Sequence, residues 1–167
     1  MIFVTVGTHE QPFDRLIEYI DNLRKNGVIQ EEVIMQTGYS TYEPEYCVWE
    51  KMYTYSQMIE FMNDARIVIT HGGPSSFILP LQRGKIPIVV PRLCKYNEHV
   101  NDHQFDFALE VEKRNKNIIV VREMNELDDR IEEYDNIVKK MKGGHESNNA
   151  TFCMELEKIV SEMFKEK

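Results

Sequence analysis

The stretch "THGGPSS" (residues 70–76) follows the apolar run "RIVI" and has the composition of an anion-binding loop. Glycine has no side chain that would keep an anion away from backbone N–H groups, and a helix start adds partial positive charge. Ser75 and Ser76 could donate to phosphate oxygens at that helix start. The loop before them contains His71, Gly72, Gly73 and Pro74. An ordinary glycine–proline turn with a serine helix cap explains the spacing about equally well, so both readings stay open.

One expectation attaches to Gly73 in this loop. If the glycine serves phosphate approach, a side chain there should block the anion while leaving the core packing largely intact.

A second group of small polar residues follows the first apolar run. In "GTHEQP", Gly7, Thr8 and His9 come just after "IFVTV". A further contact to an anion or a sugar is compatible with them. So is an ordinary strand-to-helix turn with Thr8 as the helix cap, and the residues taken alone favour the turn.

Five polar side chains crowd the segment "NEHVNDHQ": Glu98, His99, Asp102, His103 and Gln104. A sugar needs many paired donors and acceptors, so such a cluster suits sugar binding. His99 and His103 are four residues apart, so on a helix they would share a face that can bind zinc. No third ligand motif accompanies them, and we expect no metal site. A polar helix start, where the dipole favours acidic residues, explains the same composition.

Short apolar runs alternate with amphipathic stretches along the chain. We expect strands over residues 2–6, 33–36, 46–53, 66–70, 86–91 and 117–121. We expect helices over residues 13–26, 56–63, 75–84, 97–115, 126–142 and 149–166. Ser56 is the expected N-cap of the second helix, and Pro80 the expected early proline of the third. The alternation predicts an α/β fold with a doubly wound, mainly parallel, Rossmann-like sheet, whose ligands bind at the rim where the strands end.

The composition restricts the class of partner. The chain of 167 residues is 42% hydrophobic with a formal net charge of −8, which fits one globular domain and argues against nucleic-acid binding. No apolar run approaches the length of a membrane span and the N-terminus lacks a secretory pattern, so we expect a cytoplasmic location. Cys47, Cys94 and Cys153 are widely spaced, which favours reduced thiols over disulfides.

As an ordered set, these motifs resemble the C-terminal domain of family 28 glycosyltransferases. The set is "VTVGTHEQPFDRLI", "QTGYS", "ARIVITHGGPSS", "GKIPIVVPR" and "NEHVNDHQ", and it covers residues 2 to about 122. The resemblance implies that residues 1–167 form a single donor-binding domain, the C-terminal half of a GT-B enzyme, with amphipathic helices over about 123–167. The family includes stand-alone soluble subunits of two-component UDP-sugar transferases. These act on dolichol-linked precursors or on lipid-linked capsule and exopolysaccharide precursors, and the chain resembles them.

The resemblance also implies which residues meet a UDP-sugar donor. The loop from Gly72 to Ser76 would lie at the diphosphate, the backbone of Thr54 and Tyr55 at the uracil, and residues 102–104 at the sugar. The full implied set is Gly7, Thr8, Thr54, Tyr55, His71, Gly72, Gly73, Pro74, Ser75, Ser76, Asp102, His103 and Gln104. His9, near the reacting centre, is the candidate catalytic residue. The implied reaction is inverting transfer with no cofactor and no obligatory metal, because helix ends and N–H groups would stabilise the UDP leaving group.

A GT-B active site lies between two Rossmann-like domains, and this chain has room for one. The resemblance therefore implies a membrane-anchored partner subunit that binds the lipid-linked saccharide acceptor and holds this chain at the inner face of the membrane. The donor sugar could be glucose, galactose or N-acetylglucosamine.

One position departs from the family pattern. Many relatives have a glutamate that binds the ribose hydroxyls after the glycine loop, and here that register holds Leu79, which cannot accept hydrogen bonds. The departure favours an alternative in which the chain is a non-catalytic activator or scaffold subunit. The intact "HGGPSS" and "NDHQ" motifs favour donor binding. A third reading, a nucleotide-binding protein outside sugar transfer, rests on the phosphate loop alone.

Overall fold

The computed structural model describes residues 1–141, 154–158 and 161. At the centre of this part of the chain lies a six-stranded sheet in which every neighbouring pair of strands is parallel. The strands are β1 (Ile2–Thr5), β2 (Val33–Gln36), β3 (Val48–Glu50), β4 (Ile67–His71), β5 (Ile88–Val90) and β6 (Ile119–Val120). Their order, β3-β2-β1-β4-β5-β6, reverses between β1 and β4. The predicted doubly wound α/β fold is confirmed, with all described strand pairs parallel.

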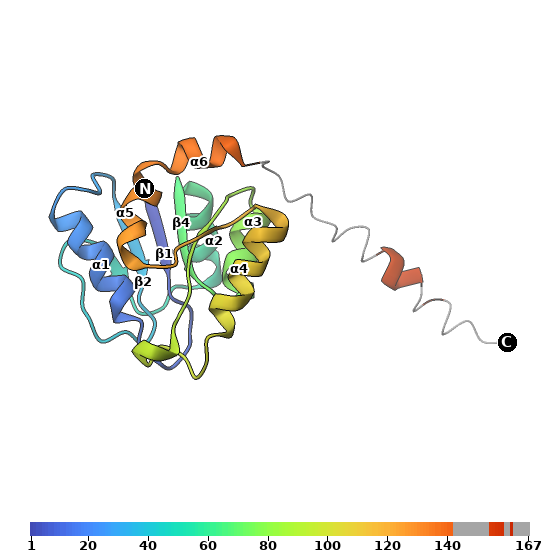
Figure 1. Cartoon of the computed structure of the whole chain (residues 1–167), viewed down its shortest axis with the longest axis horizontal. Helices are drawn as coiled ribbons and strands as arrows, with labels where there is room; N and C mark the ends of the chain where they lie inside the picture. The colour runs from blue at the N-terminus through green and yellow to red at the C-terminus, as the bar shows by residue number, and fades with distance from the viewer. Residues whose placement is uncertain (142–153, 159–160, 162–167) are drawn as a thin grey trace.

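Helices cover both faces of the sheet (Figure 1). They are α1 (Asp14–Lys25), α2 (Tyr55–Asp64), α3 (Pro74–Gln82), α4 (His103–Asn115), α5 (Leu127–Glu132) and α6 (Tyr134–Lys140), with single turns of 3-10 helix, η1 (Cys94–Tyr96) and η2 (Met124–Glu126). Helices α1, α5 and α6 contribute to the core on one face, and α2, α3 and α4 to the two clusters on the other. A parallel sheet buried on both faces needs strands that are apolar throughout, which explains the unbroken runs in the sequence.

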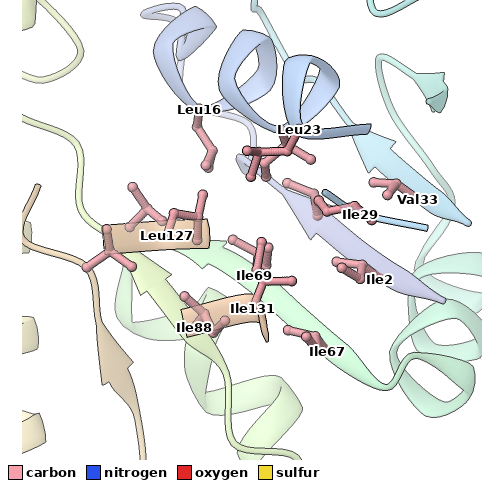
Figure 2. Packing of buried hydrophobic residues seen from close by; sticks show 14 of the residues in the cluster. Ile2, Leu16, Leu23, Ile29, Val33, Ile67, Ile69, Ile88, Leu127 and Ile131 are labelled. Atoms are coloured by element: carbon pink, nitrogen blue, oxygen red, sulfur yellow. The ribbon is translucent and has the colours of Figure 1, made fainter. Parts of the chain in front are cut away.

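The larger core cluster lies between the sheet and α1 and α5. Figure 2 shows Leu16 and Leu23 of α1 facing Ile2 and Ile69 of the sheet, with Leu127 of α5 nearby. All of these side chains are buried. The apolar spacing that predicted α1 is therefore the spacing of its sheet-facing side.

Two helix starts differ from the sequence prediction. Helix α2 is capped by Thr54 and not by Ser56, because Thr54 and Gln57 form a capping box: the Thr54 hydroxyl oxygen accepts from the Gln57 N–H at 3.3 Å. Helix α4 begins at His103 and not at residue 97. The chain before it is interrupted by Asn97, whose left-handed φ of 58° ends the η1 turn.

Later elements differ in their limits as well. The helix expected over residues 126–142 is divided at Glu133 into α5 and α6, and Tyr134 buries its ring while its hydroxyl donates to the carbonyl of Ile86 at 2.7 Å. Pro80, expected in the first turns of α3, lies near the end of that helix, which ends at Gln82, and Pro74 occupies its first position. The helix expected over 149–166 lies largely outside the described residues; residues 154–158 and 161 are helical.

Candidate functional site

Half of the predicted catalytic and donor-binding residues meet at one cavity, at the carboxyl ends of β1 and β4 where the strand order reverses. The cavity has a volume of about 530 Å³. Seven of the residues expected from the sequence line it: Gly7, Thr8, His9, His71, Ser75, Ser76 and Gln104. A crevice outside the strand ends at this reversal is the usual ligand site of a doubly wound sheet.

His71, the last residue of β4, organises the loop that follows it. Its Nδ1 accepts a hydrogen bond from the Gly73 N–H at 3.0 Å, and its Nε2 lies 2.7 Å from the Ser76 hydroxyl oxygen. Since Nδ1 accepts, Nε2 carries the ring proton and donates it to Ser76. The hydrogen of the Ser76 hydroxyl is then free to donate to a ligand in the cavity.

The imidazole of His71 is neutral at physiological pH. Burial, supported by the nearby positive charge of Arg92, lowers the pKa of His71 to about 4. A neutral ring is what the two hydrogen bonds require, because a protonated Nδ1 could not accept from Gly73. The site thus presents hydroxyl and N–H donors without a histidine cation.

The glycines of both loops are needed to accommodate the His71 ring. A Cβ built on Gly73 would lie 2.3 Å from the His71 Cε1, and one on Gly7 would lie 2.5 Å from its Nε2. The expectation that a side chain at Gly73 leaves the packing intact is therefore wrong. The Gly73 N–H also donates to His71, which leaves the first-turn N–H of Ser75 and the two serine hydroxyls as the donors for an anion.

His9 lies in the same cavity and is held by two neighbours. Its Nε2 is 2.9 Å from the Gln11 Oε1, while the Gln11 amide nitrogen donates to the Asn97 carbonyl at 3.0 Å. That second bond fixes the orientation of the amide, so the His9 Nε2 carries the proton and its Nδ1 keeps a lone pair. The His9 ring also stacks on His99 at 4.9 Å between centroids. His99 therefore supports His9 from the loop before α4, and the helical face expected to join His99 with His103 does not exist.

A buried ionic network holds the loops around His9. Arg92 is fully buried, and its guanidinium donates to the carbonyls of Val6 at 2.9 Å and Gln11 at 2.7 Å, and more weakly to that of Glu98. Burial lowers the pKa of Arg92 to about 10, and it still remains charged at neutral pH. Glu98 accepts both bonds of a bidentate pair with Arg15, at 2.7 and 2.8 Å. Glu98 thus serves the loop structure and is turned away from a sugar ligand.

A second hollow lies beside the first cavity. It has a volume of about 680 Å³, and Gly72, Gly73, Pro74 and His103 line it. Gln104 lines both spaces, and its side-chain amide group lies 3.4 Å from the His71 Nδ1. Gln104 therefore marks the boundary between the cavity at the serines and the hollow at the start of α4.

Three of the predicted residues lie elsewhere. Thr54 is engaged in the cap of α2, and Tyr55 is 68% exposed on that helix. The Asp102 carboxylate accepts from the Cys94 N–H at 2.7 Å. None of the three lines either space.

Sequence reasoning missed the floor and one wall of the first cavity. Thr5 and Gln36 line its floor, and Met58 and Met62 line a wall beside Leu79, the one wall residue that the sequence had singled out. The signal for the floor was present, because Thr5 and Gln36 are the polar last residues of otherwise apolar strands.

A metal-binding cluster and a membrane-spanning helix are both absent from the described residues. They contain no group of three or more His, Cys, Asp or Glu side chains that could hold a metal ion. No helix among them has both the length and the apolarity to cross a bilayer.

Comparison with known families gives a match over nearly the whole chain. The sequence matches the family model of the glycosyltransferase family 28 C-terminal domain over residues 1–163. The chain belongs to this family. Its expected place as the C-terminal half of a GT-B glycosyltransferase is thereby supported.

Two individual proteins show similarity as well. The chain is 34% identical over 122 residues to a human (Homo sapiens) protein named UDP-N-acetylglucosamine transferase subunit ALG13; the match takes 67% of this chain and 10% of that protein. The chain therefore spans about a tenth of that relative. Among solved structures, the glycosyltransferase SnogD from Streptomyces nogalater superimposes with a TM-score of 0.51 at 14% identity, over 83% of this chain and 37% of SnogD. At that identity the likeness speaks for the fold alone.

Proposed function

We propose that this family 28 domain binds a UDP-sugar and acts as the donor half of an inverting hexosyltransferase. The observation that carries the proposal is the hydrogen bond from the neutral His71 ring to Ser76, at 2.7 Å, beneath the first turn of α3. It leaves the Ser76 hydroxyl hydrogen free beside Ser75 and a helix N-terminus. This arrangement suits a diphosphate, whose charge grows as the bond to the sugar breaks.

The transfer proceeds by attack of an acceptor hydroxyl oxygen on C1 of the sugar. The bond between C1 and the diphosphate oxygen breaks, UDP leaves with the electron pair, and the acceptor proton passes to a base. His9 is the candidate base, because Gln11 holds its proton on Nε2 and leaves the Nδ1 lone pair for the acceptor. The serine donors and the start of α3 stabilise the UDP that forms. No step here is assigned to a metal ion.

A partner subunit completes the site in this proposal. The relative ALG13 is named as a subunit of a UDP-N-acetylglucosamine transferase, which supports an assembly of more than one chain. A facing surface is needed to align the acceptor hydroxyl with C1 and to exclude water. We propose a membrane-anchored partner, a lipid-linked saccharide acceptor in capsule, exopolysaccharide or similar synthesis, and a place for this chain at the inner membrane face.

A second candidate is a non-catalytic activator or scaffold subunit. It is favoured by the apolar wall of Met58, Met62 and Leu79, which offers no hydrogen bonds to a ribose. The two functions differ in donor binding, because a scaffold does not need it.

The deciding experiment is calorimetric titration of the full chain with UDP, UDP-glucose, UDP-galactose and UDP-N-acetylglucosamine. The same donors, radiolabelled, are then offered with membranes that carry the partner. Donor binding by the chain, together with transfer only when both components are present, supports the proposal. Absence of donor binding, or full transfer by the membranes alone, supports the scaffold instead.

A further inference from the structure

A row of polar side chains crosses the sheet at the bottom of the first cavity. Thr5 of β1 is in register with Gln36 of β2 on one side and with Thr70 of β4 on the other. All three are 2% exposed or less. These three polar residues form one row across neighbouring strands, near the carboxyl ends of strands that are otherwise apolar.

The row lies on the face covered by α2 and α3. Side chains alternate across a strand, so Thr5 and Gln36 face the same way as Phe3 and Ile34, two residues earlier. Phe3 and Ile34 belong to the cluster that packs against Leu79 of α3. The row is thus the polar end of an apolar layer, and it opens into the cavity through Thr5 and Gln36.

Hydrogen bonds hold the Gln36 side chain in one orientation. The Gly7 N–H donates to the Thr5 hydroxyl oxygen at 3.3 Å, and that hydroxyl donates to the Gln36 Oε1 at 2.6 Å. The Gln36 amide nitrogen faces the Met52 sulfur at 3.5 Å. A thioether is a weak acceptor, and an amide nitrogen carries two hydrogens. Among the described residues Gln36 has no other acceptor, so its amide keeps unused donor capacity while buried.

The surroundings of Gln36 restrict what could use that donor. Met58 and Met62 of α2 and Leu79 of α3 line the same cavity. An apolar wall makes burial of a phosphate charge at this depth unfavourable. The charge of a ligand is better placed at the other end, at Ser75 and Ser76. A neutral group with hydrogen-bond acceptors suits the floor.

We propose that Gln36 is a ligand-binding residue whose amide donates to the neutral nucleoside part of the nucleotide, while the diphosphate lies at Ser75 and Ser76. The inference rests on the proposed function and adds to it a position for the nucleoside. In this arrangement the floor supplies the polar contact that Leu79 cannot make. The nucleoside enters the cavity.

The test compares two probes on the full chain by calorimetry: UDP, which has a nucleoside, and inorganic diphosphate, which has none. Gln36→Met keeps the length of the side chain and removes the amide. Gln36→Asn keeps an amide but withdraws it by one carbon, and it serves if the Met variant does not fold. Met52→Leu is the matched control, because it removes the sulfur beside Gln36 without altering a residue that lines the cavity.

We expect either Gln36 variant to lower UDP affinity about tenfold, the worth of one hydrogen bond, with inorganic diphosphate binding unchanged. Met52→Leu should bind both probes as the wild type does. If a folded Gln36 variant binds UDP normally, or loses both probes equally, Gln36 does not bind the nucleoside, and the proposed function stands. If the wild type binds neither probe, the proposed function fails and this inference fails with it.

Discussion

The His71 Nε2 lies 2.7 Å from the Ser76 Oγ, and this pair joins the end of β4 to the first turn of α3. The bond has a direction, because the Nδ1 of the same ring accepts from the Gly73 N–H. A buried neutral histidine here sets which way a serine hydroxyl points. The loop is therefore arranged around His71, and its glycines give the ring room.

Ser76→Ala tests the proposed anion contact. The variant removes one donor to the diphosphate, and we expect UDP affinity to fall about tenfold or more, since bonds to charged groups are the stronger class. Calorimetric titration with UDP measures the loss. Ser56→Ala is the control, because Ser56 is exposed in the first turn of α2 and outside the cavity. Equal UDP binding by Ser76→Ala and the wild type would remove Ser76 from the diphosphate site.

Gly73→Ala tests whether the glycine is needed for His71. The φ of Gly73 is −68°, which any residue adopts, so the only strain comes from the contact of 2.3 Å between the new Cβ and the His71 ring. We expect a loss of about 1–3 kcal/mol in the free energy of unfolding, as for other overpacked sites. In a His71→Ala background the ring is gone, and the same glycine substitution should cost little. Denaturant melts of the four chains give the coupling; additive effects would contradict the packing role.

The sheet and most of its elements could be predicted from the sequence because each signal is local. Apolar runs bounded by glycine and proline gave six strands, and one of them, Val33–Gln36, has the predicted bounds. The start of α4 could not be found that way. It depends on Glu98 turning inward to Arg15, a contact between residues 83 apart in the sequence.

The candidate site also combines features that local sequence signals predict with features that depend on contacts between distant residues. Strand-end loops predicted where His9, His71 and Ser76 would gather, because parallel strands end at one rim. The polar floor depends on register, since Thr5 and Gln36 meet only when β1 and β2 pair. The structural role of Arg92 could not be predicted for another reason. A charged residue in a loop is usually solvated, and only the fold shows that the partners of Arg92 are backbone carbonyls.

The stability of the chain should depend on the protonation of His71. In the unfolded chain its pKa is close to 6.5, and in the folded chain burial and Arg92 lower the pKa to about 4. Between these values only the unfolded chain takes up the proton, so stability present above pH 6.5 is lost as the pH falls to about 4, by at most about 3 kcal/mol. Denaturant melts at pH 7 and 4.5 measure it. His71→Gln should lose less on acidification; an identical pH dependence would show that His71 is not responsible.

Glu98→Gln tests the buried network behind His9. The Glu98 side chain accepts from Arg15 and from the Leu93 N–H, and the residue is 3% exposed. Removing its charge leaves the partly buried guanidinium of Arg15 and the buried one of Arg92 without their anion, and we expect the free energy of unfolding to fall by about 3 kcal/mol. The control is Glu112→Gln, which removes the ion pair with the half-exposed Arg122 and should cost about 1 kcal/mol or less. Equal costs in thermal melts would mean that burial does not distinguish the two pairs.

Gln104→Ala tests the boundary between the two spaces. A diphosphate held at Ser75 and Ser76 directs the sugar toward Gln104, which lines both the first cavity and the hollow beyond it. The lost contact should therefore concern the sugar more than UDP. We expect UDP affinity to change by less than about threefold, while transfer with the partner present falls by about tenfold or more, because a sugar contact also positions C1 for attack. Calorimetry with UDP measures the affinity, and a radiolabel transfer assay with the partner measures the transfer. Glu110→Ala, an exposed change on the same helix that touches neither space, should leave both unaltered. If Gln104→Ala weakens UDP binding as much as transfer, the side chain acts on the nucleotide site as a whole, and the sugar assignment is wrong.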